Sequence, residues 1–136
     1  MKTGVTSDNE WVRKMKPVVA KSWEADFLET PSPYERHTQV LLSEKTHGVR
    51  SAAIGTTTIP PGSQTDYHSH ERTDEYFIFT KDHGRLKVDG NEVDVEPGIV
   101  VCAPAQSKHQ VINNSKKLCM HTGFFVRLDQ RKLYLK

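Results

Sequence analysis

Three histidines and one glutamate are spaced in a way that suits a metal site. His68 and His70 are separated by one residue, Glu75 follows soon after, and His109 comes from a distant part of the chain. Side chains two apart in a strand point to the same face, roughly 6.5–7 Å apart, so both imidazoles could converge on one ion. Three imidazoles and a carboxylate, without a thiolate, suit Fe(II), Mn(II), Ni(II), Co(II) or Zn(II). Two positions of a six-coordinate shell would stay open for a substrate or dioxygen.

The segments that would position these residues are short and rich in β-branched and aromatic residues. We expect strands over residues 38–42, 49–59, 74–80, 85–88, 92–96, 99–103, 108–113 and 118–128, separated by Gly, Pro, Asn and Asp. Asp89-Gly90-Asn91 is a tight hairpin signal. Because no helical periodicity separates these runs, the sequence predicts an all-β barrel or sandwich. Glu75 would share the face of the histidines only if the loop before it turns the chain inward.

Two longer motifs resemble those of the cupins. The first motif consists of a glycine, a His-x-His pair and a glutamate, which are here Gly62, His68, His70 and Glu75. The second consists of a glycine, a proline, a histidine and an asparagine, which are here Gly98, Pro104, His109 and Asn113. The resemblance covers roughly residues 50–126. It implies a double-stranded β-helix, or jelly-roll barrel, with an N-terminal arm. It also implies one divalent transition metal per chain (Fe, Mn, Zn, Ni or Co), with His68, His70, Glu75 and His109 as ligands. The alternative is a metal-free barrel with hydrogen-bonded histidines.

The motifs depart from the cupin pattern at three positions. Asp82 stands where the first motif has a glycine, Gln106 replaces a glycine of the second, and Ile99 replaces a common acidic residue. Asp tolerates turn conformations, so we expect a hairpin of changed shape without loss of the fold. A glycine at the position of Gln106 usually marks a positive φ, so this loop is also expected to differ.

Other residues are candidates for proton transfer or for contact with a substrate. His121 could be an acid or base that faces the cavity or a core histidine, and Tyr76 is a second candidate for moving a proton. By strand alternation from the ligands, and by their position near the barrel mouth, the candidates for binding substrate are Phe77, Phe79, Val111, Asn113, Arg50 and Arg36. For the apolar residues packing is the simpler role, and for each arginine a surface position is the alternative to carboxylate binding.

Length and composition limit the other possibilities. A chain of 136 residues forms one domain, in which we expect an arm over residues 1–46, a barrel over 47–128 and a tail over 129–136. The net charge of +2 comes from scattered residues, and neither a basic tract nor a membrane-spanning run is present, so we expect no nucleic-acid or membrane partner. Cys102 and Cys119 lie in apolar runs and predict buried thiols in a cytoplasmic protein.

The reaction is less constrained than the site. Our first hypothesis is an Fe(II)-type dioxygenase acting on a small organic acid, phenolic or diketone-like substrate. The second is a non-redox metal enzyme, such as a sugar or uronate isomerase, a decarboxylase or a lyase, because the cupins include such enzymes. The third is a binding module without catalysis. We also expect a homodimer, because the arm between residues 18 and 42 leaves strand edges to be covered.

Overall fold

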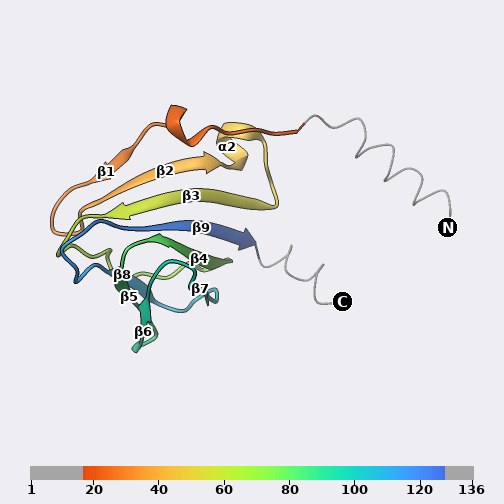
Figure 1. Cartoon of the computed structure of the whole chain (residues 1–136). Coiled ribbons are helices and arrows are strands. Elements are labelled where there is room, and N and C mark those ends of the chain that lie inside the picture. Colours follow the sequence, from red (N-terminus) through yellow and green to blue (C-terminus); the bar gives the residue numbers. More distant parts are fainter. Residues whose placement is uncertain (1–16, 128–136) are drawn as a thin grey trace.

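The computed structural model describes residues 17–127, and within them almost all regular structure is β (Figure 1). The elements in chain order are the 3₁₀ turn η1 (Ser22–Glu24), β1 (Leu28–Thr30), β2 (Arg36–Leu42), α2 (Glu44–His47), β3 (Ala52–Ile59), β4 (Thr73–Lys81), β5 (Gly84–Val88), β6 (Asn91–Val95), β7 (Val100–Ala103), β8 (His109–Ile112) and β9 (Cys119–Arg127). No helix in this part of the chain is long and apolar enough to cross a membrane. The expected strands are present with ends shifted by a few residues.

The strands form two antiparallel sheets. The larger sheet has the order β1-β2-β3-β9-β4-β7, and the smaller has the order β6-β5-β8. Because β9 lies between β3 and β4, the end of the described chain is in the middle of the larger sheet (Figure 1). This arrangement is the predicted all-β jelly roll. The N-terminal strands β1 and β2 extend the larger sheet and are paired with it through β3.

The apolar core contains side chains from both sheets. Its buried members include Phe77 and Phe79 from β4, Leu86 from β5 and Val111 from β8, each at most 2% exposed. Phe77 and Phe79 lie two residues apart on one strand, and their rings stack with centroids 6.2 Å apart. The alternation of β4 therefore directs one face of the strand into the core, as the sequence pattern predicts.

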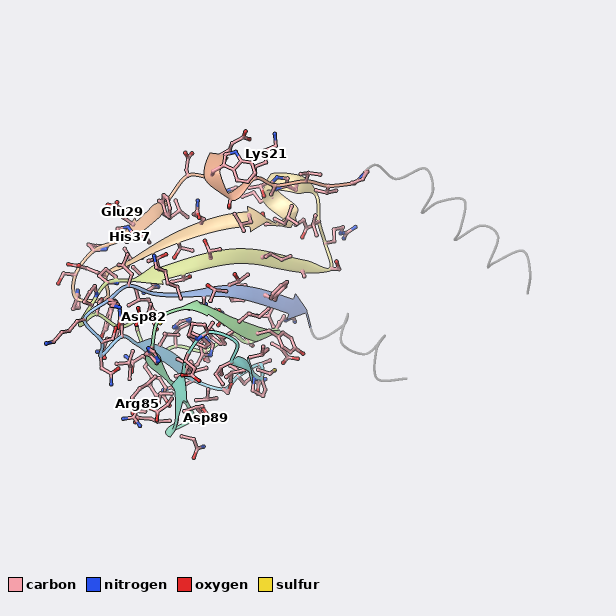
Figure 2. All side chains as sticks on the ribbon, viewed as in Figure 1. Lys21, Glu29, His37, Asp82, Arg85 and Asp89 are labelled. Carbon is pink, nitrogen blue, oxygen red and sulfur yellow. The ribbon has the colours of Figure 1, made fainter. Side chains whose placement is uncertain are left out.

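Several polar contacts fix the N-terminal segment and the surface. Gln39 on β2 donates through Nε2 to the carbonyls of Ser22 and Ala25, at 2.7 and 2.9 Å, which anchors η1 on the sheet. On neighbouring strands β1 and β2, Glu29 and His37 are paired in register, and Nδ1 of His37 lies 3.5 Å from Oε1 of Glu29 (Figure 2). His37 therefore lies at the surface beside the carboxylate of Glu29.

Two turn positions test the departures from the cupin motifs. Asp82 has φ 60° and Gln106 has φ 73°, so both adopt the left-handed conformation that favours glycine. Asp82 is stabilised there because its Oδ1 accepts a hydrogen bond from the main-chain N–H of His83. We expected the loop at Gln106 to differ from that of the cupin motif. Its φ does not differ in this way, because Gln106 has the positive φ that a glycine would adopt at this position.

One prediction about the thiols is wrong. Cys119 is fully buried, but Cys102 is exposed, and neither is in a disulfide. Cys102 is adjacent to buried Ala103 on β7, an edge strand of the larger sheet. Side chains alternate along a strand, so Cys102 faces outward although its neighbours in sequence are apolar.

Candidate metal centre

His68 and His109 are held opposite each other by the main chain. The N–H of His68 donates to the carbonyl of His109 at 3.1 Å, and the N–H of His109 donates to the carbonyl of His68 at 2.7 Å. Residues 60–72 form no continuous strand; this isolated bridge, together with a second one between Gln64 and Ile112, attaches the segment to β8. It places imidazoles from distant parts of the sequence side by side, with ring centroids 4.6 Å apart.

His70 and Glu75 are brought to the same place by different elements. The carbonyl of His70 accepts a hydrogen bond of 2.7 Å from the N–H of Gln106, in the loop before β8. Glu75 is near the start of β4, where it pairs in register with Phe125 of β9 and Ala103 of β7. The loop between His70 and β4 therefore does turn the chain inward, which the sequence left open.

The ligand atoms of His68, His70, Glu75 and His109 lie within 4.8 Å of one another. Oε2 of Glu75 is 2.6 Å from Nε2 of His109 and 3.5 Å from Nε2 of His70. These three atoms are buried, yet none has a partner with hydrogen-bond geometry. Buried polar atoms normally have partners, so their convergence is what a metal-binding site requires.

In His68 and His109, the ring nitrogen Nδ1 lies beside a main-chain carbonyl. Nδ1 of His68 is 2.9 Å from the carbonyl of Asp66, and Nδ1 of His109 is 3.3 Å from the carbonyl of Ser107. A carbonyl can only accept, so Nδ1 carries a proton in both residues, and Nε2 is the ring nitrogen that is left to bind a metal. Burial alone would raise the pKa of Glu75, but the imidazoles of His109 and His70 outweigh it and lower the pKa to about 2. This donor set is suitable for a divalent transition metal.

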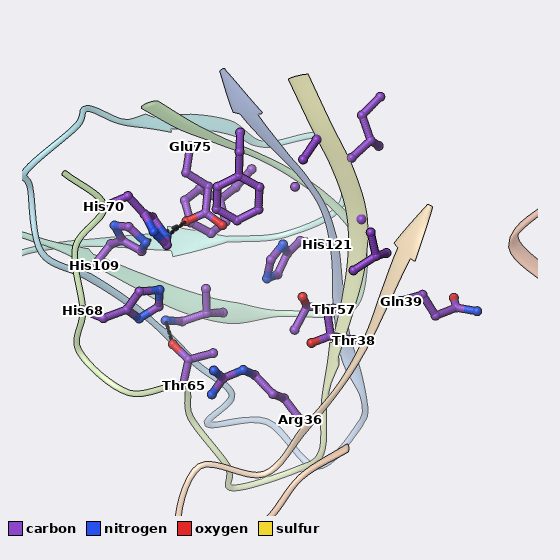
Figure 3. Close-up of a pocket in the computed structure, with 18 residues that line it drawn as sticks. Arg36, Thr38, Gln39, Thr57, Thr65, His68, His70, Glu75, His109 and His121 are labelled. Carbon is purple, nitrogen blue, oxygen red and sulfur yellow. Dashed lines mark hydrogen bonds and ion pairs between the residues drawn. The ribbon is translucent and has the colours of Figure 1, made fainter. Parts of the chain in front are cut away.

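The four residues lie at one side of a cavity of about 280 Å³ between the sheets (Figure 3). Its walls are mostly apolar and include Phe77, Val111 and Phe125. Gly55 and Gly123 are opposite each other in register on β3 and β9 and also line it. A Cβ on Gly123 would make only ordinary contacts, 3.7 Å from Oε1 of Glu75, so its absence leaves space beside the candidate ligands.

His121 lies on the floor of this cavity and is only 4% exposed. Its ring is flanked by Phe77 and Phe79, with centroid distances of 5.1 and 5.4 Å. Burial lowers the pKa of His121 to about 4, and nearby Glu75 only partly opposes this effect. Nδ1 is buried without a hydrogen-bond partner. His121 is therefore a neutral imidazole that lines the cavity and has one ring nitrogen without a hydrogen-bond partner.

The predicted substrate-binding residues separate into two groups. Phe77, Val111 and Arg36 line the cavity, whereas Phe79, Asn113 and Arg50 do not. Phe79 faces inward but is covered in the core. Arg50 is an exposed residue before β3, and its Nε lies 3.6 Å from Oε1 of Glu44. The alternative of a surface arginine therefore describes Arg50.

Asn113 has a structural position that the motif alone did not reveal. Its Nδ2 donates to the carbonyls of Ile59 and Lys117, both at 2.7 Å, and its Oδ1 accepts from the N–H and hydroxyl of Ser115. The side chain is 1% exposed and closes the turn after β8. With its amide fully engaged, Asn113 has no group to offer a substrate.

Tyr76 also does not line the cavity. It lies between Glu75 and Phe77 on β4, both of which face inward, so alternation directs Tyr76 to the opposite face. The proposed role of Tyr76 in moving a proton is not supported by this position. His121 is the candidate that remains in the cavity.

Some cavity residues were missed at the level of the sequence. Thr38, Thr57 and Thr65 line the cavity with Gly123 and Phe125. Gly123 and Phe125 could have been found by alternation from His121 along the last strand. Thr38 and Thr57 carry no such signal, because only the pairing of β2, β3 and β9 shows that they share a face with His121. Thr65 lies in the irregular segment between β3 and β4, to which strand alternation does not apply.

Comparison with known proteins agrees with this geometry. The model of the cupin domain family matches residues 55–124. No protein with a curated description matches the sequence. One similar solved structure is a predicted oxalate decarboxylase from Thermotoga maritima, with 20% identity over 81% of this chain and 99% of that chain and a TM-score of 0.74. KdgF from Halomonas sp. has 15% identity over 85% of this chain and 99% of that chain, with a TM-score of 0.68. A cupin-2 domain protein from Rhodospirillum rubrum has 18% identity over 82% of this chain and 77% of that chain, also with a TM-score of 0.68.

At these identities the solved structures show the fold, and the match over residues 55–124 contains all four candidate ligands. With the two-sheet barrel and the motifs in place, the chain belongs to the cupin family.

Proposed function

We propose that this protein is a mononuclear metal enzyme that binds a small molecule in the cavity between its sheets. One divalent ion would be held by His68, His70, Glu75 and His109. The observation that carries the proposal is the convergence of three buried atoms without hydrogen-bond partners, Nε2 of His70, Nε2 of His109 and Oε2 of Glu75. When bound, such an ion supplies Lewis-acid or redox chemistry to a substrate placed beside it.

The cavity provides what a small substrate needs next to such an ion. Phe77, Val111 and Phe125 form apolar walls beside the candidate ligands. Gly123 leaves space directly beside Glu75. At about 280 Å³, the cavity is at or below the lower end of the range of roughly 300–1,000 Å³ for drug-sized ligands, so the occupant is small.

His121 favours a non-redox reaction that moves a proton. Its neutral ring lines the cavity and has a nitrogen without a hydrogen-bond partner, so it can accept a proton from a substrate carbon or oxygen and return it. Isomerisation, lyase chemistry and decarboxylation all need such a group, whereas activation of dioxygen does not. One of the similar structures is a predicted oxalate decarboxylase, which is consistent with this class of reaction.

An Fe(II)-type dioxygenase acting on a small organic acid, phenolic or diketone-like substrate is the second candidate. The observation that favours it is the apolar wall of Phe77, Val111 and Phe125, which suits a partly hydrophobic substrate. The two reactions differ in what they consume. Only the dioxygenase requires oxygen for every turnover, whereas the non-redox enzyme works equally well in its absence.

An exchange experiment tests the proposed function. Protein loaded with Mn(II), Co(II), Zn(II) or Fe(II) is incubated anaerobically in D₂O with small hydroxy acids, oxo acids and sugars, and proton exchange or product formation is followed by NMR. We expect metal-dependent turnover that falls by roughly 10²–10⁴-fold in His121→Gln, with metal content unchanged. Turnover that needs oxygen and Fe(II) would instead support the dioxygenase. No turnover with any metal would leave a binding barrel.

We also propose that the protein assembles as a homodimer through its N-terminal strands. β1 is an edge of the larger sheet, and Val19, Trp23, Phe27 and Leu28 beside it are between 57% and 80% exposed. A second copy of the chain, paired along this edge, would cover both the open strand edge and these side chains. Light scattering should give twice the chain mass, and the double variant Trp23→Glu with Phe27→Glu should give a monomer. A monomeric wild-type protein would contradict the proposal.

A further inference from the structure

Arg36 brings a positive charge to the cavity that the proposed function does not use. It is the first residue of β2, it lines the cavity, and its side chain is only 23% exposed. Figure 3 shows its guanidinium pointing toward Thr65 and His68, on the side of the candidate ligands.

The contacts of Arg36 leave most of its donors available. Nη1 lies 3.1 Å from Oδ1 of Asp66 and donates to the carbonyl of Tyr34 at 3.4 Å. Within residues 17–127 these are the contacts that Arg36 makes, and both use Nη1. A guanidinium has five N–H donors, so Nε and Nη2 can still bind a carboxylate through two parallel hydrogen bonds.

Asp66 connects Arg36 to the candidate metal centre. One oxygen of its carboxylate lies beside Arg36, the other is 3.6 Å from Nδ1 of His68, and its carbonyl accepts from that same Nδ1. Arg36 is therefore separated from a candidate ligand by a single carboxylate. A group bound to Arg36 from the cavity side would lie close to the candidate ion.

The charges of the cavity favour an anion. Arg36 and Glu75 are the charged side chains among the described residues that line it, and their charges cancel. The histidine ligands are neutral when they bind a metal. A divalent ion would therefore leave the cavity positive, and Asp66 would neutralise it only in part. A positive cavity with low-dielectric walls attracts a small anion.

A row of polar side chains crosses the floor of the cavity. Thr38 pairs in register with Thr57, and Thr57 pairs with His121 on β9, and all three line the cavity (Figure 3). Nδ1 of His121 is the buried atom of this row that has no partner. A substrate hydroxyl would satisfy it in either tautomer, because a hydroxyl both donates and accepts.

Building on the proposed function, we propose that the substrate is a small hydroxylated carboxylic acid. Its carboxylate binds to Nε and Nη2 of Arg36, and a hydroxyl group binds to Nδ1 of His121. The carbon between these groups then lies in the space beside Glu75 that Gly123 leaves open. Arg36 and His121 act as residues that determine specificity, and the candidate ligands need make no contact with the carboxylate.

Three probes of similar size separate the two contacts: lactate, its neutral amide lactamide, and propionate, which lacks the hydroxyl. Their binding to protein loaded with one equivalent of Mn(II) is measured by calorimetry. Lactate should bind about tenfold or more tightly than lactamide, because a hydrogen-bonded charge pair is lost in the amide. Arg36→Gln should remove this preference. Arg50→Gln, which changes an arginine outside the cavity, should retain it.

The hydroxyl contact is tested in the same way with His121→Phe. This variant should lose the preference for lactate over propionate but keep the preference for lactate over lactamide. The proposal is overturned if the preference for the carboxylate survives in Arg36→Gln, or if none of the probes binds the wild-type protein at millimolar concentration.

Elemental analysis of each variant separates this result from a failure of the proposed function. If the Arg36→Gln variant retains its metal but loses lactate binding, the proposal is supported. A purely structural role of Arg36 would also change the metal content of the variant. If the wild-type protein takes up no metal, the proposed function fails. The comparison of lactate with lactamide in that metal-free protein then still decides whether Arg36 binds a carboxylate, since an equal affinity for both overturns the proposal.

Discussion

His68 and His109 form a β-bridge, in which each donates a main-chain hydrogen bond to the other. Two candidate ligands are therefore placed by backbone pairing, and the N–H of Gln106 holds the carbonyl of a third, His70. The arrangement does not depend on an ion for its geometry. The core between the sheets is formed by other residues, so we expect the protein to fold without the metal.

Removal of the metal should accordingly lower the stability without unfolding the protein. A ligand at about 100 times its Kd stabilises the folded state by about 2.7 kcal/mol, and chelation should remove a contribution of this order. Circular dichroism should show the same β-signal with and without a chelator, together with a lower melting temperature for the chelated sample. Loss of the β-signal on chelation would show that the ion is needed for the fold.

Asn113→Ala should destabilise the protein and leave metal binding unchanged. Truncation leaves the buried carbonyl of Ile59 without the donor that it has in the wild type, and it removes three further hydrogen bonds in the turn. We expect a loss of about 2–4 kcal/mol in urea denaturation. The exposed neighbour Asn114→Ala is the control and should change stability by less than about 0.5 kcal/mol. Equal stability of the two variants would contradict this role.

Gln106→Gly should stabilise the protein. Gln106 has φ 73°, and for a residue with a Cβ this conformation costs about 1–2 kcal/mol. Glycine avoids that cost but loses more entropy on folding, so the net gain should be about 0.5–1 kcal/mol in urea denaturation. Gln64→Gly is the matched control, because Gln64 is also exposed and its φ is not positive, and it should destabilise. A destabilised Gln106→Gly would mean that the left-handed turn carries no strain.

His121 should make the metal-free protein less stable in mild acid. Its pKa is lowered from 6.5 to about 4 by burial, so the unfolded state binds a proton that the folded state does not. The free energy of unfolding therefore falls as the pH drops from 6.5 toward about 4. Urea denaturation of the wild type across this range should show a steeper fall than His121→Gln. Parallel curves would indicate that His121 is not buried in the neutral form.

The sequence predicts most of this fold because β-strands, glycines and prolines leave local signals. The faces of β4 follow from alternation, which correctly places Glu75 and Phe77 inward and also shows why Tyr76 is directed away from the cavity. Alternation from buried Ala103 puts Cys102 on the outer face of β7, but it does not tell whether another element covers that face. Local patterns identify faces, whereas the order of strands in the sheet decides which faces are covered.

The parts of the site that depend on the spacing of residues in the sequence are predictable, whereas the parts that depend on the pairing of strands are not. The spacing of the histidines and Glu75 identifies the candidate ligands, and the structure brings them together. Arg36 and Arg50 look equivalent in sequence, but the first faces the cavity from β2 and the second pairs with Glu44 on the surface. The difference arises from sheet geometry, which no local pattern contains.

The central claim is that this barrel holds one divalent metal ion per chain, and elemental analysis tests it most directly. Protein purified without chelators or a nickel column should contain, or take up on titration, one ion per chain. His68→Ala and Glu75→Gln should lose tight binding, while His47→Ala, which changes an exposed histidine outside the site, should retain it. A wild-type protein that contains no metal and takes up none, or a His68→Ala variant with unchanged metal content, would contradict the account.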